Sequence, residues 1–437
     1  MTRGDLPKVS IFPILAVNFV ATLGFAVVLP PLVFLVTRFG GNALVFGLMG
    51  ATYSFFQLVA APILGRWSDR YGRRRILLLS EIGAVFSWGI FLVAITLPSL
   101  PLASIDSRIL GSFTLTVPLV VLFVARALAG LSGGDVSIAN AYLADITDED
   151  QRNASFGKMA VASNLGFVFG PALAALLAAL GMREVVTVVA ALLISVAACL
   201  IIVFGLPEST PCVLQADPEQ VNVRKWFGQA QKQCFSMLAT RKLSLREVLA
   251  LPTMKVLLAL YFLVFLAFNL FYVAFPVYAS TDIGWSLTAI GVYFAAMGSM
   301  MALVQGPLLN RLSRRASERS LALAGSVLLA ASFPFFTARS AVAIYFGTGL
   351  LAIGNGIMWP SLMSALSRTT DRGAQGAVQG IASGVGSIAS IAGLLLGGLL
   401  YHALGNRVFL IATILVALSC ALCLLLPTRN RTVALRS

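Results

Sequence analysis

The chain has 437 residues, of which 59% are hydrophobic and only 11% charged, and its mean hydropathy is +0.92. Soluble domains contain about 25% charged residues, so this composition excludes an ordinary water-soluble protein. Its apolar runs, such as 185–206 and 408–426, are continuous and long enough to cross a membrane as helices. Strands of outer-membrane barrels instead alternate over segments of about ten residues. The sequence therefore predicts an α-helical membrane protein.

Twelve such apolar segments follow one another along the chain, separated by short polar or Gly- and Pro-containing connections. We expect each to form one spanning helix, because a helix satisfies its backbone hydrogen bonds internally in lipid. In chain order the predicted spans are 11–37, 44–65, 75–97, 115–143, 154–180, 183–206, 253–279, 286–309, 320–338, 341–366, 375–402 and 406–427.

The formal net charge of +14 would suggest a nucleic-acid partner in a soluble protein. Here most Lys and Arg fall in the connections on one side of the predicted membrane, so no nucleic-acid partner is expected. By the positive-inside rule that side is the cytoplasm, which places both termini there. The first apolar run is too long for the core of a signal peptide and is interpreted as a span.

A polar stretch at 207–252 separates six spans from six. It divides the chain into an N-terminal six-helix bundle at 1–206, a cytoplasmic linker at 207–252 and a C-terminal six-helix bundle at 253–437. In the linker, apolar residues from Trp226 to Leu238 recur at helical spacing beside basic ones, which favours a short amphipathic helix on the membrane surface. Ser244 and Glu247 can form a capping box for another. A solvated tether is the alternative.

The two halves contain matching patterns, which indicates an internal duplication. A Gly-x-x-x-Asp/Asn-Arg-x-Gly/Ser-Arg-Arg pattern begins at Gly65 and again at Gly306, 241 positions later. A second pair, Gly157 with Gly170, recurs as Gly380 with Gly393 at a shift of 223. Repeated halves that rock around a shared site are common in secondary transporters.

Residues 65–75, Gly-Arg-Trp-Ser-Asp-Arg-Tyr-Gly-Arg-Arg-Arg, resemble the loop signature between spans 2 and 3 of the major facilitator superfamily. Arg126 with Gly130 and the run 141–147 resemble that family's span 4 motif in the twelve-span drug:proton antiporter branch, near the tetracycline-efflux type. The stretch from Leu23 to Pro30 is similar to the branch's span 1 motif. The resemblance implies the major facilitator fold: twelve transmembrane helices in two pseudo-symmetric six-helix bundles.

The resemblance also implies two functional groups of residues. An inner gate that latches the halves would comprise Gly65, Asp69, Arg70, Gly72, Arg73, Asp145 and Arg152. The span 5 antiporter motif would comprise Gly166, Gly170 and Pro171. In two places the chain departs from the branch: Ala174-Ala175 replaces a Gly pair, and Ala21 occupies the position of an acidic residue of tetracycline exporters.

Ionisable residues inside a membrane are costly, so those present are functional candidates. Glu81, Arg126 and Asp135 lie well within the predicted spans and are candidates for proton coupling. A carboxyl removed from water favours its protonated form, which suits proton loading. Arg126 and Asp135 are nine positions apart, about 180° around one continuous helix, so we expect them on opposite faces. In the alternative, Asp135 is a hydrogen-bonded packing residue beside Ser132-Gly133-Gly134.

Polar and aromatic residues at helical spacing are candidates for the substrate cavity, although the same stripes also occur at helix–helix contacts. A largely aromatic, uncharged lining would suit a lipophilic or amphipathic substrate. The candidates are Asn18, Thr22, Phe25, Tyr53, Gln57, Asn164, Phe265, Asn269, Tyr272, Asn355 and Trp359.

These patterns favour a secondary active transporter that exports a lipophilic or amphipathic molecule in exchange for protons. The alternatives are a facilitator or symporter of a metabolite, sugar or lipid, and a non-transporting membrane receptor. An enzyme is not expected: no catalytic or metal-ligating pattern is recognised, and His402, the single His, falls at a helix end. Neither cofactor nor metal is expected. The expected partners are a small-molecule substrate, protons and membrane lipid, for a monomer in a bacterial inner membrane.

Overall fold

The computed structural model describes residues 10–108, 110–147, 149–209, 245–251, 253–313, 315–367, 369 and 375–426. Contacts divide the chain into two compact units. The N-unit takes the described residues of Met1–Gly40, Thr52–Ala103 and Thr114–Ala239, and the C-unit takes those of Gly41–Ala51, Ser104–Phe113 and Thr240–Ser437. The predicted boundaries at residues 206 and 253 stay a prediction.

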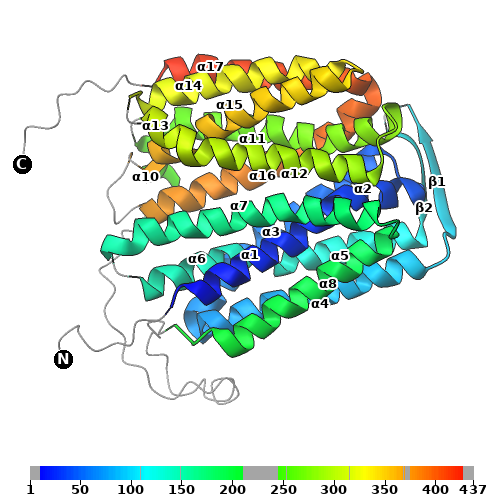
Figure 1. Cartoon of the computed structure of the whole chain (residues 1–437), viewed down its shortest axis with the longest axis horizontal. Helices are drawn as coiled ribbons and strands as arrows, with labels where there is room; N and C mark the ends of the chain where they lie inside the picture. The colour runs from blue at the N-terminus through cyan, green and yellow to red at the C-terminus, as the bar shows by residue number, and fades with distance from the viewer. Residues whose placement is uncertain are drawn as a thin grey trace, which may run out of the picture. The chain divides into compact units, whose positions relative to one another are not determined.

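Eight helical segments lie in the described residues up to 209 (Figure 1). The first span is divided at Val28 into α1 and α2, directly before Pro30 and Pro31, and Pro fits the first turn of a helix but not its interior. The bounds are α1 Phe12–Val27, α2 Leu29–Arg38, α3 Ala43–Tyr71, α4 Arg73–Thr96, α5 Val117–Ser132, α6 Asp135–Ile146, α7 Glu149–Ala179 and α8 Glu184–Gly205.

The second half begins with α10, Leu245–Ala250, at the predicted capping box, although Ser244 itself lies outside the described residues. The predicted amphipathic helix around Trp226 also lies outside them. Two helices continue through π-helical turns, α11 into Tyr278–Asp282 and α12 into Val304–Leu308. The bounds are α11 Met254–Val277, α12 Leu287–Leu303, α13 Leu309–Ser313, α14 Glu318–Ser332, α15 Ala341–Ser367, α16 Gln375–Leu404 and α17 Val408–Leu424.

Among the described residues, eleven helical segments are long and apolar enough to cross a membrane. The last of them, Val378–Leu424, contains both α16 and α17, which a 3-10 turn at Gly405–Arg407 separates. Twelve spanning helices result, at positions within a few residues of the predicted ones. The prediction of a polytopic α-helical membrane protein is confirmed.

The connection between α4 and α5 is a two-stranded sheet, where the sequence suggested only a loop. Strand β1, Pro101–Ser107, pairs with β2, Gly111–Thr116, beyond the ends of the two helices (Figure 1). Gly111 has φ +77°, a backbone conformation that Gly adopts without strain at the turn. The alternating Phe, Thr and Leu residues of β2 suit a half-buried strand. The Thr116 hydroxyl donates to the Phe39 carbonyl at 2.8 Å and fixes the strand's end.

The fourth span is interrupted rather than continuous. Helix α5 ends at Ser132 and α6 begins at Asp135, with Gly133 and Gly134 between them. A Cβ on Gly134 would lie 2.6 Å from the Leu64 side chain, so the close approach of α3 requires glycine here. The break changes the direction of the side chains that follow it, so the angle between Arg126 and Asp135 cannot be counted along one continuous helix.

Paired glycines bring two helices into close contact in each unit. In the N-unit, added Cβ atoms on Gly166 and Gly170 of α7 would meet α1 backbone atoms at 2.9 Å. In the C-unit, those on Gly393 and Gly397 of α16 would meet α11 carbonyls at 2.7 and 3.0 Å. These pairs correspond at a shift of 227, so the predicted shift of 223 is wrong by about one helical turn. Glycines recur every four residues in α16, and spacing alone could not select among them.

Candidate functional site

A small cavity of about 50 Å³ lies inside the N-unit, among helices α1, α3, α4, α5, α6 and α8. It brings together two of the acidic residues predicted for proton coupling, Glu81 of α4 and Asp135 of α6, together with the rings of Phe25 and Tyr53. The remaining lining is mostly small, with the indole of one Trp: Ala21, Ser80, Ala84, Ser87, Trp88, Ala129, Ser132, Gly133 and Ser195. The cavity therefore encloses two carboxyls in apolar and hydroxyl-bearing surroundings.

Arg126 contacts the same two rings that line the cavity. Its guanidinium carbon lies 4.9 Å from the ring centre of Tyr53 and 5.7 Å from that of Phe25, the geometry of a cation–π interaction. The residue is 4% exposed, and its Nε has no hydrogen-bond partner among the described residues. The prediction that Arg126 and Asp135 occupy opposite faces stays a prediction, because Asp135 lines the cavity whereas Arg126 contacts two of the rings that line it. The Gly133–Gly134 break makes the 3.6-residue count across it invalid.

The charges of Glu81, Asp135 and Arg126 do not cancel when all three groups are ionised. Within the described part of the chain no ion pair within 4.0 Å joins Arg126 to Glu81 or Asp135. Glu81 is 2% exposed, so water does not compensate its charge. A buried charge without a partner is expensive, and two carboxylates and one guanidinium sum to one negative charge. One added proton would make the group neutral. The arrangement can therefore take up and release a proton.

Hydrogen bonds fix the walls of this cavity. The Gln57 amide nitrogen donates to the Gly133 carbonyl at 2.9 Å and lies 3.3 Å from the Tyr53 hydroxyl, which ties α3 to the helix break. On the other wall, the Trp88 indole N–H donates to the Ser195 hydroxyl at 3.2 Å. These contacts hold the walls in one geometry around the carboxyls.

Ala21 lines the cavity, at the position where the resemblance implies an acidic residue. Its methyl group offers no proton site. The two acids on α4 and α6 surround the same space instead. The departure in span 1 therefore leaves the N-unit interior with acidic groups from other helices.

The other N-unit candidates for the substrate cavity lie at helix contacts. The Asn18 amide donates to the Met159 carbonyl at 3.2 Å and to the Ser163 hydroxyl at 2.6 Å, both on α7. The Thr22 hydroxyl donates to the Asn18 carbonyl at 2.7 Å. Asn164 is half-buried on α7. The α1–α7 contact that Asn18 and Thr22 reinforce also contains Gly166 and Gly170, while Pro171 follows inside α7.

Aromatic side chains gather in the C-unit. Phe265 lies with its ring centre 4.8 Å from that of Tyr261 and 4.9 Å from that of Trp359, and Tyr261 and Trp359 are 5.1 Å apart. We name these three residues the aromatic cluster. Two were predicted, whereas Tyr261 was missed, although its position four residues before Phe265 placed it on the same helix face.

The remaining C-unit candidates have separate surroundings. The Asn269 amide donates to the Phe265 carbonyl at 2.8 Å and to the Ser390 hydroxyl of α16 at 3.1 Å. The ring centre of Tyr272 lies 5.4 Å from that of Phe294, and Asn355 is half-buried on α15. Asn269 thus connects two helices, as Asn18 does in the N-unit.

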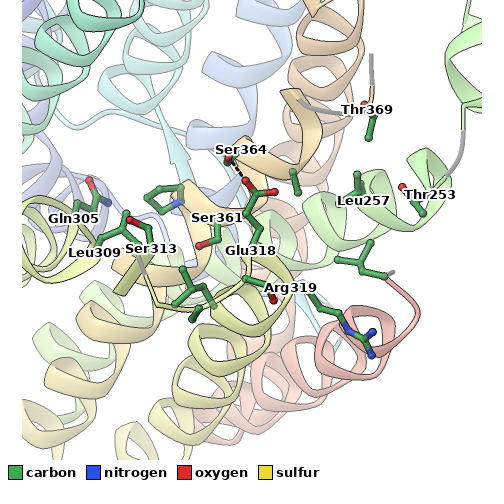
Figure 2. A pocket seen from close by; sticks show the side chains of 16 residues that line it. Thr253, Leu257, Gln305, Leu309, Ser313, Glu318, Arg319, Ser361, Ser364 and Thr369 are labelled. Carbon is green, nitrogen blue, oxygen red and sulfur yellow. Dashed lines mark hydrogen bonds between the residues drawn. The ribbon is translucent and has the colours of Figure 1, made fainter. Parts of the chain in front are cut away.

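A larger cavity of about 690 Å³ lies in the C-unit, between the ends of α11, α13, α14, α15 and α17 (Figure 2). Its lining is rich in hydroxyl groups, including Ser361 and Ser364 of α15, and contains the carboxylate of Glu318. The Ser364 hydroxyl donates to that carboxylate at 2.6 Å, while Arg319 extends to the end of α17 (Figure 2). None of its lining residues was predicted as a site residue.

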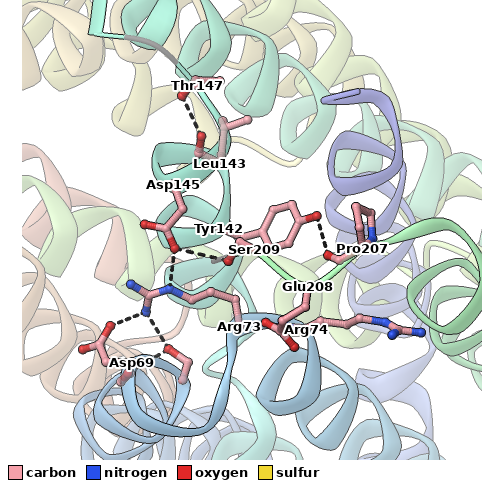
Figure 3. A network of polar contacts seen from close by, with 12 residues as sticks. Asp69, Arg73, Arg74, Tyr142, Leu143, Asp145, Thr147, Pro207, Glu208 and Ser209 are labelled. Atoms are coloured by element: carbon pink, nitrogen blue, oxygen red, sulfur yellow. Dashed lines mark hydrogen bonds and ion pairs between the residues drawn. The ribbon is translucent and has the colours of Figure 1, made fainter. Parts of the chain in front are cut away.

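A charged network joins three elements of the N-unit, and its predicted role as a latch between the halves stays a prediction (Figure 3). The Arg73 guanidinium lies between the carboxylates of Asp69 and Asp145, with its Nε 3.0 Å from Asp145 Oδ2. It also donates to the Ser68 hydroxyl at 2.8 Å. The network connects α3, α4 and α6 at one end of the unit.

Other predicted gate residues shape this network or lie beside it. Gly72 has φ +106°, which favours glycine, and a Cβ there would lie 2.8 Å from the Glu208 carboxyl. The Arg70 guanidinium lies 5.5 Å from the ring centre of Tyr71. Gly65 lies in α3 with open space around it. The side chain of Arg152 lies outside the described part of the structure.

Sequence reasoning missed the segment that completes the network. The Tyr142 hydroxyl donates to the Pro207 carbonyl at 2.7 Å, and the Ser209 hydroxyl lies 3.3 Å from Asp145 Oδ2 (Figure 3). The Glu208 carboxylate accepts from the Arg74 backbone N–H at 3.1 Å. The signal available in the sequence was Glu208, a single acidic residue directly after the sixth span, together with the basic run at 73–75.

Comparison with known proteins identifies the family. Residues 14–337 and 257–436 match the model of the Major Facilitator Superfamily. Tetracycline resistance protein, class D, from Salmonella ordonez is 26% identical over 419 residues, covering 94% of this chain and 95% of that protein. Multidrug resistance protein 1 from Bacillus subtilis (strain 168) is 26% identical over 409 residues, with 92% of each chain covered.

Solved structures agree on the fold. A D-xylose-proton symporter matches with a TM-score of 0.70 at 13% identity, covering 94% of this chain and 96% of that one. The human organic anion transporter MFSD10 (TETRAN) matches with a TM-score of 0.64 at 22% identity, covering 94% and 98%. The predicted fold and the resemblance are both confirmed. The chain belongs to the Major Facilitator Superfamily, a family of membrane transporters.

Proposed function

We propose that this protein exports a lipophilic or amphipathic small molecule from the cytoplasm in exchange for protons, by alternating access. The carrying observation is the N-unit cavity, which encloses Glu81 and Asp135 and is lined by the ring of Tyr53, over which Arg126 lies. A group of two acids and one base inside a spanning bundle can change its protonation at low structural cost, which proton-driven transport requires. The protein is a transporter and an integral membrane protein, and its interior supports this coupling role.

The substrate class follows from the C-unit interior. The aromatic cluster offers ring faces and edges rather than charges, and such surfaces bind planar apolar molecules well. Two relatives are named for resistance to tetracycline and to multiple drugs. A tetracycline, a fused-ring amphipathic molecule, is therefore the first substrate to test. Phe265, Trp359 and Tyr261 are the proposed contacts.

Asp69, Arg73 and Asp145 are proposed to act as an inner gate. Asp69 is well exposed, with 62% of its side chain accessible, so its ion pair with Arg73 is screened by water and easily broken. A latch that opens in every transport cycle needs such a weak contact. Glu208 and Ser209 are proposed as further members, because they bind the same helix ends.

The proposed setting follows from the charges and the relatives. The basic connections and the bacterial relatives favour an inner membrane with both termini in the cytoplasm. We propose a monomer in contact with lipid, whose transported partners are the substrate and protons.

Proteoliposomes test this function. Vesicles with the cytoplasmic face outward would receive an acid-inside pH gradient, and uptake would be measured for tetracycline and a panel of lipophilic cations, neutral compounds and sugars. We expect the gradient to drive accumulation of tetracycline, and collapse of the gradient to abolish it. Asp135→Asn and Glu81→Gln should each reduce gradient-driven accumulation by about tenfold or more, a loss of about 1.4 kcal/mol or more.

Glu184→Gln is the matched control. Glu184 forms a 3.8 Å pair with Arg38 in which both side chains are partly exposed, and such pairs contribute little. If the Asp135→Asn/Glu81→Gln double variant keeps full gradient-driven uptake, the coupling role of these acids is wrong. Uptake that equilibrates the substrate without responding to the gradient would indicate a facilitator instead.

A further inference from the structure

At one end of each unit, an arginine near the start of the third span donates hydrogen bonds to backbone carbonyls at the end of the sixth span. In the N-unit, Arg74, the second residue of α4, donates from Nε to the Ile202 carbonyl at 3.1 Å and from Nη2 to that of Val203, in the last turn of α8. In the C-unit, Arg319, the second residue of α14, donates to the Leu424 carbonyl at 2.7 Å, at the end of α17. The two arginines are 245 positions apart, whereas the motif repeats at a shift of 241, so they are equivalent by their place in the helix and not by the motif.

In the N-unit, the residues after the last helix fill this end of the bundle. Pro207 accepts a hydrogen bond from Tyr142 of α6, Glu208 accepts one from the Arg74 backbone, and Ser209 lies 3.3 Å from Asp145 of α6. The segment thus binds α4 and α6 together directly after it leaves α8 (Figure 3).

In the C-unit, the corresponding place is the 690 Å³ cavity. Leu426, which lines it, is the last described residue after α17. Where α6 presents Tyr142 and Asp145, α15 presents the smaller Ser361, Ser364 and Ala365, which leaves room. The sequence continues as Leu426-Pro427, like Leu206-Pro207 in the N-unit.

Charge at this place is reversed between the units. The first residue of α4 is Arg73, which binds acidic side chains, whereas the first residue of α14 is Glu318, whose carboxylate lines the cavity. In the segment after each last helix, Glu208 is acidic, whereas residues 427–437 contain Arg429, Arg431 and Arg436 and no acid. In each unit, the segment after the last helix therefore carries a charge opposite to that of the first residue of the third-span helix.

We propose that residues 427–431 dock in the C-unit cavity, with Arg429 against the Glu318 carboxylate, as Pro207–Ser209 dock in the N-unit. Three residues of extended chain from Leu426 span about 10 Å, which brings Arg429 within reach of the cavity lining. Desolvation inside a cavity strengthens such a charge-assisted contact relative to one in water. The docked segment would join α14, α15 and α17 at one end of the C-unit.

Cysteine labelling tests this docking without any transport assay. Thr428→Cys would be placed in a variant whose five native Cys are changed to Ser, and its reaction with a bulky maleimide would be timed in detergent micelles containing lipid. We expect slow labelling, and labelling about tenfold faster when Glu318→Gln is added. Glu184→Gln is the matched control, because it removes the same charge at a helix start of the N-unit and should leave the labelling rate of Thr428→Cys unchanged.

Exchanging the charges of Arg429 and Glu318 distinguishes loss of their contact from general unfolding of the C-unit. Arg429→Glu alone and Glu318→Arg alone should each speed labelling, whereas the double variant should return it towards the slow rate. The native chain gives a second measurement: trypsin should cut after Arg429 slowly, and faster in Glu318→Gln. Rapid labelling of Thr428→Cys in the otherwise unaltered background, or slow labelling that Glu318→Gln does not change, would overturn the proposal.

Discussion

The interiors of the two units differ in the kind of side chain that they enclose. The N-unit surrounds Glu81, Asp135 and Arg126 with helix, whereas the C-unit surrounds stacked rings. The described acids of the C-unit lie in a strand, in the short helix α10 or at helix ends: Asp106, Glu247, Asp282 and Glu318. Both units nevertheless use the same glycine-mediated contact between their first and fifth spans. A duplicated bundle can therefore keep its packing while its halves enclose different side chains, for which we propose proton exchange in one and apolar recognition in the other.

The largest effect is expected from Arg126. Arg126→Gln leaves two carboxyls enclosed without a cation, and an uncompensated buried charge costs about 3–5 kcal/mol. The variant should melt at a clearly lower temperature in detergent than the parent. Fluorescence-monitored thermal unfolding measures this directly.

The double variant Arg126→Gln/Asp135→Asn tests whether the loss of stability in Arg126→Gln comes from an unbalanced charge. Removing one charge of each sign should restore most of the lost thermal stability, whereas gradient-driven transport should stay low because a proton site is gone. If the double variant is no more stable than Arg126→Gln, the three groups do not share a charge balance.

The shared glycine contact gives the next largest effect. Gly393→Val forces a side chain against the Leu266 carbonyl, which a Cβ would already approach to 2.7 Å, and such overpacking costs about 1–3 kcal/mol. Gly380→Val, on the same helix in open space, is the control. Unfolding temperatures of the two variants measure this contact, and an equal fall in both would argue against a specific α11–α16 contact at Gly393.

A smaller effect is expected in the aromatic cluster. Trp359→Ala removes ring contacts with Tyr261 and Phe265 and should weaken tetracycline binding about tenfold, equivalent to about 1.4 kcal/mol. Proton coupling, measured as the dependence of uptake on the gradient, should persist. Phe204→Ala, an exposed aromatic on α8, is the control. An equal loss of binding in both variants would argue against a substrate role for the cluster.

The smallest effect is expected at Glu208. Glu208→Gln keeps an oxygen that can accept from the Arg74 N–H but loses the charge at the start of α4, worth about 0.3–1 kcal/mol. The melting temperature should therefore fall only slightly. A change as large as that of Arg126→Gln would mean that the segment after α8 holds the N-unit together more strongly than its contacts indicate.

Much of the fold could be predicted because its signals are local. Apolar length and charge placement located the twelve spans within a few residues, and the motif at 65–75 led to the contact among Asp69, Arg73 and Asp145. Glu81 and Asp135 stood out because carboxyls are costly in lipid. Each of these inferences needed only one segment of sequence.

The rest depended on where segments meet. The 180° argument for Arg126 and Asp135 assumed an unbroken helix, and Gly133–Gly134 break it because α3 approaches closely there. Asn18 and Asn269 resemble cavity residues by polarity, yet each donates to a serine on a neighbouring helix. The roles of the acids, the gate and the aromatic residues stay predictions until transport is measured.

The arginine fastenings at Arg74 and Arg319 also bear on how each bundle moves. Each one connects the start of a unit's third span to the end of its sixth, so these two spans should tilt as a single body. Loosening one fastening should weaken only its own bundle. Calorimetry of Arg74→Gln and of Arg319→Gln should then show two separate transitions, with a different one shifted in each variant.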